Sequence, residues 1–238
     1  MNLNKKNNPT EKHFDTIFAE KAEHEYRLDM RNLGPKDKPI VNLLEAYGVQ
    51  GKSCLDVGPG TGRWVQFLRQ MGAESVTAID ISEQAVENCR PFCDTIIKQD
   101  IEYDRFNLTS SLFDIVISFE VMEHLYDPTH YLAEMFRVMN DNAILIMSTP
   151  NLTSLISRIR MLLGEIPIAI ASDPTHVRFY RQTDIRKLFK KINKAPIFLP
   201  TSISLNPRNP KSRLRIPSIQ MISSLDDSLV FYIHKGKS

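Results

Sequence analysis

The sequence predicts an α/β fold built on a doubly wound, mostly parallel sheet. Two observations support this prediction: short apolar, β-rich runs alternate with amphipathic segments, and a glycine-rich turn follows the first of these runs. Repeated β-α units require parallel strands that are joined by right-handed crossovers. The 238 residues are enough for one domain with a full core. We therefore expect a single domain over residues 1–238.

Two helical segments precede the first predicted strand. Residues 10–30 carry their apolar side chains on one side, and residues 39–47 form a second helical segment that stops at Gly48. We expect them to form a helical flap before the core. The expected parts of the domain are the flap at 1–50, a core that contains the glycine-rich turn at 51–151, and a lid with C-terminal strands at 152–238.

The core is predicted from five apolar runs and the helices between them. The expected strands are 53–57, 75–79, 94–98, 113–118 and 143–148, with a late strand at 228–234. Trp64, Phe67, Leu68 and Met71 recur at helical spacing before Gly72, which predicts a helix after the first strand. Asp127 and Pro128 predict the N-cap and first residue of the helix after the fourth strand. Residues 195–225 are rich in proline and are left unassigned.

The segment "LDVGPGTGRW" places Gly58, Gly60 and Gly62 between the first strand and its helix. Glycine permits a sharp turn and lets a ligand approach main-chain N–H groups near a helix N-terminus. Asp80 ends the second strand, where a carboxylate can accept hydrogen bonds from both hydroxyls of a ribose. Together these features indicate a cofactor that carries adenosine.

Other acidic residues follow the predicted strands. Because the carboxyl ends of parallel strands share one edge, Asp56, Asp80, Asp100 and Glu120 are expected along the ligand-binding edge of the sheet. A nicotinamide dehydrogenase is the alternative explanation of such a glycine loop. Its G-x-G-x-x-G spacing is not kept here, because Arg63 occupies the position of the third glycine.

The successive motifs resemble those of class I S-adenosylmethionine-dependent methyltransferases, especially the small-molecule type such as the ubiquinone-biosynthesis O-methyltransferases. The segments "LDVGPGTGRW", "AIDIS", "KQDIEY", "FDIVISFEVMEHLYDP" and "AILIMSTPN" follow one another in the family's order over about residues 50–151. A later segment, "THVRFYRQTDIRKLF", resembles the part that follows the fifth strand. The resemblance implies a Rossmann-like, seven-stranded sheet with helices on both faces, and S-adenosylmethionine as the cofactor.

The resemblance also assigns the cofactor contacts. The expected cofactor-binding residues are Asp56, Gly58, Gly60, Gly62, Asp80, Ile81, Asp100, Ile101 and Phe119. The three glycines would hold the methionine part, Asp80 the ribose, and Ile81 the face of the adenine. Asp100 and Ile101 would meet the adenine edge, and Phe119 would approach the methionine end through its backbone.

Glu120, Glu123 and His124 in "SFEVMEHLYDP" are the candidate catalytic residues. They are spaced i, i+3 and i+4, and on a helix they would share one face. They follow the fourth strand, so we expect them on the acceptor side of the ligand crevice. Three interpretations stay open: a solvated stripe, a general-base or acceptor-orienting site at His124, or most of a metal site.

A metal site would use Glu120, Glu123 and His124, with His176 in "PTHVRF" as a further ligand or as part of a substrate lid. Carboxylates and imidazoles suit Mg²⁺, Mn²⁺, Zn²⁺ or Fe²⁺. The E-x-x-E-H arrangement with a later His is similar to that of ubiquinone-biosynthesis O-methyltransferases and of small-RNA 3′-terminal 2′-O-methyltransferases. We expect O-methylation of a small-molecule hydroxyl; RNA 2′-O-methylation and cofactor binding without turnover are the alternatives.

The last third of the chain departs from the resemblance. Residues 186–225 contain nine Lys or Arg and no Asp or Glu. A solvated basic face explains this composition; the functional alternative is an anionic or lipid-linked acceptor, or peripheral contact with an anionic membrane. Residues 154–171 are apolar but interrupted by charges and Pro167, so a lid over the acceptor is favoured.

Composition excludes several other classes of protein. The net charge of +2 argues against a nucleic-acid partner. Three cysteines without secreted-scaffold spacing favour reduced thiols and a cytoplasmic location. The polar segment "MNLNKKNNPTEK" has no apolar region of a signal peptide, and no stretch approaches the ~20 apolar residues of a membrane span. The sequence predicts no oligomeric state.

Overall fold

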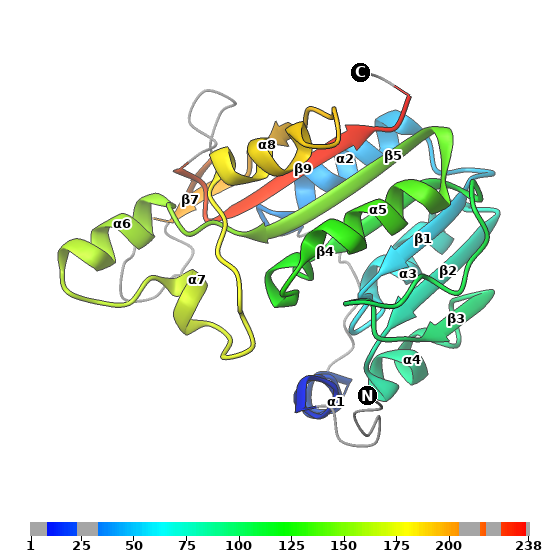
Figure 1. Ribbon diagram of the computed structural model, residues 1–238, viewed down its shortest axis with the longest axis horizontal. Helices are drawn as coiled ribbons and strands as arrows, with labels where there is room; N and C mark the ends of the chain where they lie inside the picture. The colour runs from blue at the N-terminus through cyan, green and yellow to red at the C-terminus, as the bar shows by residue number, and fades with distance from the viewer. Residues whose placement is uncertain (1–8, 23–32, 205–214, 218–224, 237–238) are drawn as a thin grey trace. The chain divides into compact units, whose positions relative to one another are not determined.

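The computed structural model describes residues 9–22, 33–204, 215–217 and 225–236 (Figure 1). The helices are α1 (Pro9–Ala22), α2 (Asp37–Tyr47), α3 (Arg63–Gln70), α4 (Glu83–Cys89), α5 (Pro128–Val138), α6 (Leu155–Leu162), α7 (Ile168–Ala171) and α8 (Gln182–Lys190), with one 3₁₀ turn, η1 (Met122–His124). The strands are β1 (Ser53–Val57), β2 (Ser75–Asp80), β3 (Thr95–Lys98), β4 (Phe113–Phe119), β5 (Met139–Pro150), β6 (Ile197–Leu199), β7 (Ser202–Ser204), β8 (Arg215–Pro217) and β9 (Ser228–His234).

Seven strands form one sheet in the order β3-β2-β1-β4-β5-β9-β6, and β7 pairs with β8 separately. The strand order runs outward from β1 in both directions, so the predicted doubly wound, mostly parallel sheet is confirmed. The chain divides into two compact units, which are described in turn. The first comprises α1, β1 to β4, α3, α4, α5 and the start of β5. The second comprises α2, η1, the rest of β5 and the later elements.

In the first unit, β1 pairs in parallel with β2 and β4, and β2 pairs in parallel with β3. Strands β1 and β2 are almost wholly buried, as expected for parallel strands with covered faces. Helix α3 turns Trp64, Phe67 and Leu68 inward and packs on β1 and β2, while α4 packs on β2 and β3. Gly72 follows α3 with φ +82°, as predicted. Helix α1 lies beside α4 (Figure 1).

In the second unit, β9 pairs antiparallel with both β5 and β6. The predicted late strand, 228–234, coincides with β9. Phe189 of α8 packs on Phe231 of β9 at 5.6 Å between ring centroids, and Tyr47 of α2 lies 6.2 Å from His234. Helices α6 and α7 occupy the connection between β5 and α8 (Figure 1). None of the helices in the described ranges has the length and apolar character needed to cross a membrane.

Several predicted elements differ at their boundaries. Helix α1 covers the start of the predicted 10–30 segment, whereas residues 23–32 lie outside the described residues. Asp127 caps α5 as predicted, accepting a hydrogen bond from Thr129 N at 2.9 Å. Strand β5 begins at Met139, four residues before the expected strand at 143–148. The apolar pattern missed this extension because Asn140, Asp141 and Asn142 are polar.

Candidate active site

The glycine loop joins β1 to α3 and is tied to the end of β2. Gly58, Gly60 and Gly62 have φ of +78°, +55° and +77°, a left-handed region that favours glycine. Gly58 N donates to Ile79 O at 2.8 Å, and Gly60 N donates to the Asp80 Oδ2 at 3.2 Å. The loop is therefore held against the carboxyl end of the neighbouring strand.

Asp80 ends β2 with only 7% of its surface exposed. Its Oδ1 accepts a hydrogen bond from Ser82 N at 2.9 Å, and its Oδ2 accepts the one from Gly60 N. A carboxylate oxygen can accept more than one hydrogen bond, so both oxygens keep capacity for ribose hydroxyls. Burial raises the pKa of Asp80 to about 6, against the opposing effect of the backbone N–H groups.

Asp56, in β1, carries a buried oxygen that lacks a hydrogen bond. Its side chain is 1% exposed, and its Oδ2 has no partner among the described residues. Burial, and then the charge of Asp80, raise the pKa of Asp56 well above its ordinary value. Leaving a buried acceptor unsatisfied costs about 1–3 kcal/mol. A donor on a bound ligand would satisfy this oxygen, so the residues fit the cofactor that the motifs imply.

Helix α1 is fixed over the glycine loop within the same unit. Asp15 Oδ1 accepts hydrogen bonds from Ser82 Oγ at 2.5 Å and from Gln84 N at 3.2 Å, both at the start of α4. A Cβ placed on Gly60 would lie 2.9 Å from Phe18 Cε1. Position 60 therefore has no room for a side chain while α1 stays in this place.

The remaining predicted cofactor-binding residues are divided between the two units. Ile81 follows β2 and Ile101 follows β3, and both are half-buried; Asp100 is exposed and accepts a hydrogen bond from Glu102 N at 3.0 Å. Phe119 ends β4 and belongs to the second unit. The contacts of these residues with a cofactor stay predictions.

The predicted common helix face for Glu120, Glu123 and His124 is wrong. Only a single 3₁₀ turn, η1, follows β4, and Glu120 precedes it with φ +58°. Hydrogen bonds to Ser148 hold this left-handed conformation: Glu120 N donates to Ser148 O at 3.0 Å, and Ser148 Oγ donates to Glu120 Oε1 at 2.7 Å. The turn ends at His124 because Leu125 returns to extended backbone.

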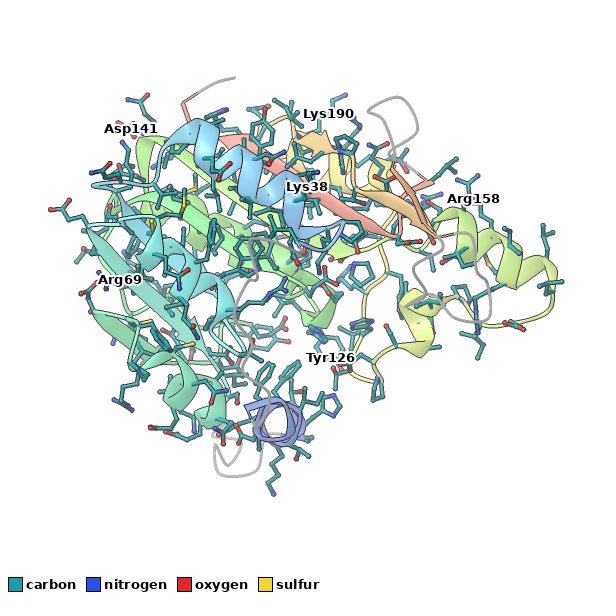
Figure 2. The ribbon with its side chains drawn as sticks, turned by 180° about the vertical axis from the view of Figure 1, so that it is seen from behind. Lys38, Arg69, Tyr126, Asp141, Arg158 and Lys190 are labelled. Carbon is teal, nitrogen blue, oxygen red and sulfur yellow. The ribbon has the colours of Figure 1, made fainter. Side chains whose placement is uncertain are left out.

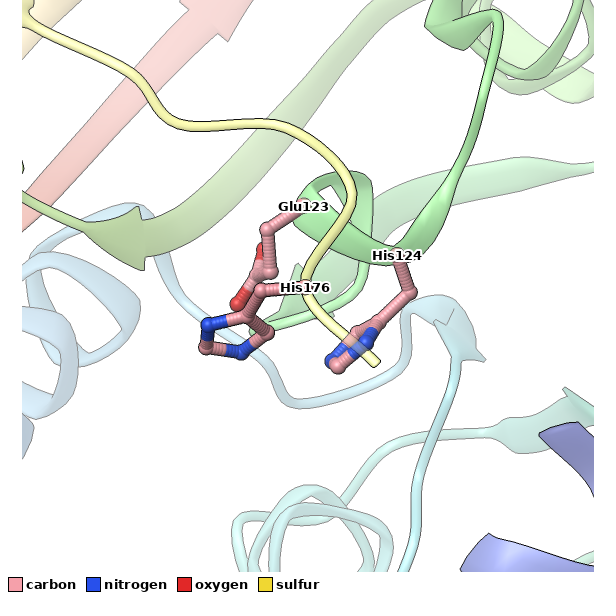
Figure 3. A group of neighbouring side chains, drawn as sticks. All are labelled: Glu123, His124 and His176. Atoms are coloured by element: carbon pink, nitrogen blue, oxygen red, sulfur yellow. The ribbon is translucent and has the colours of Figure 1, made fainter. Parts of the chain in front are cut away.

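Glu123, His124 and His176 form a cluster whose ligand atoms all lie within 4.8 Å of one another (Figure 3). Glu123 is 1% exposed. Its Oε2 accepts a hydrogen bond from Thr149 Oγ1 at 3.1 Å, whereas Oε1 has no partner among the described residues. Burial, and then the charge of Glu120, raise the pKa of Glu123 well above its ordinary value. A cation held by the cluster would give Oε1 its missing partner.

Backbone hydrogen bonds bring the loop that carries His176 to η1. Val177 N and Arg178 N both donate to Glu123 O at 3.0 Å. The Arg178 guanidinium donates to the carbonyl oxygen of Tyr126, which is labelled in Figure 2. The imidazole of His176 is thereby placed beside the 3₁₀ turn, although it comes from a distant part of the chain.

The hydrogen bonds of the two imidazoles assign their tautomers. His176 Nδ1 lies 2.7 Å from Ala169 O and therefore donates to it. Thr175 Oγ1 donates to Asp173 Oδ1 at 2.5 Å, so it accepts from His124 Nδ1 at 3.0 Å. In the neutral form of each ring, Nε2 is then the nitrogen without a proton, the arrangement usual for metal-binding histidines. Burial, and then the charge of His176, lower the pKa of His124, which favours its neutral form.

Glu120 lies outside the three-residue cluster and pairs with Lys36. The Lys36 Nζ is 3.2 Å from Glu120 Oε1. Burial by itself would raise the pKa of Glu120, but the charge of Lys36 and the hydrogen bond from Ser148 bring it below its ordinary value. Glu120 is therefore ionised, while its neighbour Glu123 favours the protonated form.

Sequence reasoning missed several residues of this site. Asp173 and Thr175 stand beside His176 in "DPTH", so their polar character was visible, but nothing indicated that they hold His124. Lys36 has no local signal at all, because its position in front of α2 matches no motif. Only the folded chain brings its ammonium group to Glu120.

A family model described as a methyltransferase domain matches residues 18–195. The chain belongs to this methyltransferase family. The resemblance of its motifs to S-adenosylmethionine-dependent methyltransferases is thereby confirmed. The match includes the glycine loop, Asp80, Glu120 and the cluster around Glu123.

The curated relatives are named for different methyl acceptors. The chain is 30% identical over 151 residues to the mitochondrial ubiquinone biosynthesis O-methyltransferase of Schizosaccharomyces pombe, covering 60% of this chain and 55% of the relative. It is 30% identical over 109 residues to the ubiquinone biosynthesis O-methyltransferase of Neisseria meningitidis, covering 43% and 46%. It is 31% identical over 121 residues to the ribosomal protein L11 methyltransferase of Thermotoga petrophila, covering 49% and 44%. The chain thus spans about half the length of the curated relatives it matches.

Solved structures share the fold over nearly the whole chain. Magnesium protoporphyrin IX methyltransferase from Synechocystis PCC 6803, with bound SAH, has a TM-score of 0.64 at 18% identity and covers 95% of this chain and 98% of its own. An S-adenosylmethionine-dependent methyltransferase from Archaeoglobus fulgidus has a TM-score of 0.61 at 17% identity, covering 93% and 100%. This chain and the two solved structures share the Rossmann-like fold.

Proposed function

We propose that this chain transfers a methyl group from S-adenosylmethionine to a hydroxyl oxygen of a small molecule, with the help of a divalent cation. The observation that carries the acceptor chemistry is the cluster of Glu123, His124 and His176, with ligand atoms within 4.8 Å of one another. It combines a buried carboxylate that lacks one hydrogen bond with two imidazoles that use Nδ1 for hydrogen bonds within the protein and so leave Nε2 for a ligand. These groups suit Mg²⁺ or Mn²⁺ as well as Zn²⁺.

The first unit provides the groups for the cofactor. Bound S-adenosylmethionine supplies an electrophilic methyl group on a positively charged sulfur. The left-handed glycines present main-chain N–H groups, and Asp80 can accept from ribose hydroxyls. The oxygen of Asp56 that lacks a partner suits the ammonium group of the methionine part.

Strand topology supports assigning the two sites to one reaction. β1 and β4 are parallel neighbours, with Asp56 opposite Ile117. Segments that follow parallel neighbouring strands begin at the same edge of a sheet, which is where ligands bind in such folds. The glycine loop follows β1, and Glu120 with the three-residue cluster follows β4.

Each acceptor-side residue has a separate task in this proposal. Glu123, His124 and His176 would hold the cation, which would lower the pKa of a hydroxyl and orient it. Glu120, kept ionised by Lys36, takes the hydroxyl proton. The acceptor oxygen then bonds to the methyl carbon while the carbon–sulfur bond breaks, and the sulfur leaves as a neutral thioether.

The finer identity of the acceptor is part of the proposal. The name of the Schizosaccharomyces pombe relative favours oxygen as the methylated atom. The expected anionic or lipid-linked acceptor depended on residues 186–225, of which 205–214 and 218–224 lie outside the described residues. That expectation, like peripheral membrane contact, stays a prediction, and so does the preference for a small molecule over RNA.

The test begins with cofactor binding and continues with transfer. Calorimetry should detect S-adenosylhomocysteine (SAH) binding to the purified protein. Methyl transfer is then measured over catechol, cyclic polyols, a lipid quinol precursor and an RNA 3′ end, each with and without chelator. We expect transfer to a hydroxyl compound, loss of activity on chelation and recovery with Mg²⁺ or Mn²⁺.

The variants Glu123→Gln and His176→Ala test the three-residue cluster separately from the cofactor site. Both variants should lose at least a hundredfold in activity while their SAH affinity stays within about threefold of wild type. Activity that survives chelation would reject the cation. SAH binding without transfer to any acceptor would favour the non-catalytic alternative, and methylated RNA would favour the second enzymatic one.

A further inference from the structure

The second unit contains a cavity of about 240 Å³ that has Glu120 in its wall. Much of the remaining wall comes from the connection after β5, including Ile156, Ser157, Ile168 and Ala169. This connection is the segment that the sequence predicts to cover the acceptor. The cavity belongs neither to the glycine loop nor to the three-residue cluster.

The volume of the cavity favours a small ligand. An apolar cavity of about 150 Å³ can hold benzene. At about 240 Å³, this cavity fits one substituted six-membered ring. A nucleotide or the length of a lipid chain would exceed it.

The chemistry of the wall favours an uncharged ring with hydroxyl groups. Pro150, Ile156 and Ile168 offer apolar surface, while Asn151 and Ser172 add polar groups. Two carboxylates, of Glu120 and Asp227, also line the cavity, and no Lys or Arg is among its described lining residues. Lys36 pairs with Glu120, but none of the described lining residues is a Lys or Arg that could pair with an anionic ring.

One hydrogen bond links the cavity to the cluster. Ala169 lines the cavity, and its carbonyl oxygen accepts the hydrogen bond from His176 Nδ1 at 2.7 Å. Glu120, on another part of the wall, is the ionised carboxylate that precedes η1. A ring in the cavity is thus bordered by the general base and by a residue that orients a cluster imidazole.

From these observations we infer that the methyl acceptor binds in this cavity as a single uncharged ring that presents a hydroxyl to Glu120. The inference rests on the proposed function and proposes a small, uncharged acceptor in place of the anionic or lipid-linked one expected from the sequence. The ring can be aromatic, as in catechol, or saturated, as in a cyclic polyol. Ala169 and Ile168 then determine how large a ring is accepted.

Substitutions in α7 test the cavity. Ala169→Leu fills it, whereas Ala171→Leu adds the same volume at an exposed position of the same helix. Binding of catechol, glucose and 3,4-dihydroxybenzoate is measured by ligand-observed NMR, and SAH affinity by calorimetry. We expect one of the two uncharged rings to bind, Ala169→Leu to weaken this binding at least tenfold, and Ala171→Leu to leave it unchanged. SAH affinity should stay within about twofold in both variants.

A variant that enlarges the cavity tests whether the weaker ring binding expected of Ala169→Leu comes from lost space or from misfolding. Ile168→Ala should gain binding of 2,3-dihydroxynaphthalene, which wild type should not bind. The inference is overturned if no ring binds, if Ala169→Leu binds as wild type does, or if the benzoate binds best. Ring binding that depends on Ala169 without any SAH binding would reject the proposed function and keep the cavity assignment.

Discussion

Glu120 combines an unusual backbone conformation with a charged side chain. A left-handed conformation costs a residue other than glycine about 1–2 kcal/mol. Two hydrogen bonds to Ser148 and the ion pair with Lys36 offset this cost. Strained positions of this kind cluster at functional sites, which agrees with the catalytic role proposed for Glu120.

A pair of substitutions measures the backbone cost at residue 120. Glu120→Ala and Glu120→Gly both remove the ion pair and the side-chain hydrogen bond, but only glycine is free of strain at φ +58°. We expect the glycine variant to be more stable than the alanine variant by about 1 kcal/mol in urea unfolding. Equal stabilities, or a more stable alanine variant, would show that the local backbone relaxes after the side chain is removed.

The pKa of His124 should move in opposite directions when its two charged neighbours are neutralised. Asp173 favours the imidazolium form and His176 disfavours it. Asp173→Asn should therefore lower the pKa of His124, and His176→Asn should raise it. Titration of the imidazole by NMR measures both shifts. A shift of the same sign in both variants would contradict the opposite effects of the two groups on His124.

At the scale of secondary-structure elements, one side chain anchors helix α1 to helix α4. Asp15 accepts from Ser82 and Gln84, while Phe18 approaches Gly60. We predict that Asp15→Ala frees α1, weakens SAH binding several-fold and costs about 1 kcal/mol of stability, as loss of a cap does. Calorimetry and urea unfolding give the two values.

Thr16→Ala is the matched control for this prediction. Thr16 is exposed on the same helix, and its hydroxyl donates only to Lys12 O one turn away. It should leave SAH affinity unchanged. If both variants behave alike, helix propensity and not the contact with α4 explains the effect.

The elements were largely predictable because apolar runs and turn residues specify them locally. The strands 53–57 and 228–234 coincide with β1 and β9, and Gly72 follows α3 as expected. The failures have non-local causes. Hydrogen bonds to Ser148 stabilise the conformation of Glu120 that interrupts the predicted helix, and the ion pair of Lys36 depends on the folded chain. Local patterns contain neither kind of information.

At the scale of the whole molecule, the two proposed ligands belong to different compact units. The glycine loop and Asp80 lie in the first unit, whereas η1 and His176 lie in the second. A ligand at 100 times its dissociation constant stabilises the state that binds it by about 2.7 kcal/mol. Each ligand should therefore protect mainly the backbone of the unit that holds it.

Hydrogen exchange with mass spectrometry tests this division. SAH should slow exchange in the glycine loop and α1 by up to about a hundredfold. Mn²⁺ should slow it in residues 119–126 and 173–178. Glu123→Gln provides the control, since it should abolish the second effect and keep the first. Protection by Mn²⁺ in the glycine loop alone would place the cation elsewhere.

The antiparallel pairing of β5 with the later strand β9 also affects how the chain folds while it is synthesised on the ribosome. β5 pairs with β9 from Ile144 to Pro150, yet β9 is the last of the seven sheet strands to be synthesised. At roughly 5–20 residues per second, the partner strand emerges about 4–15 seconds after β5. During that interval the apolar edge of β5 is open to other chains. A chaperone that binds extended apolar segments would find its target in nascent β5.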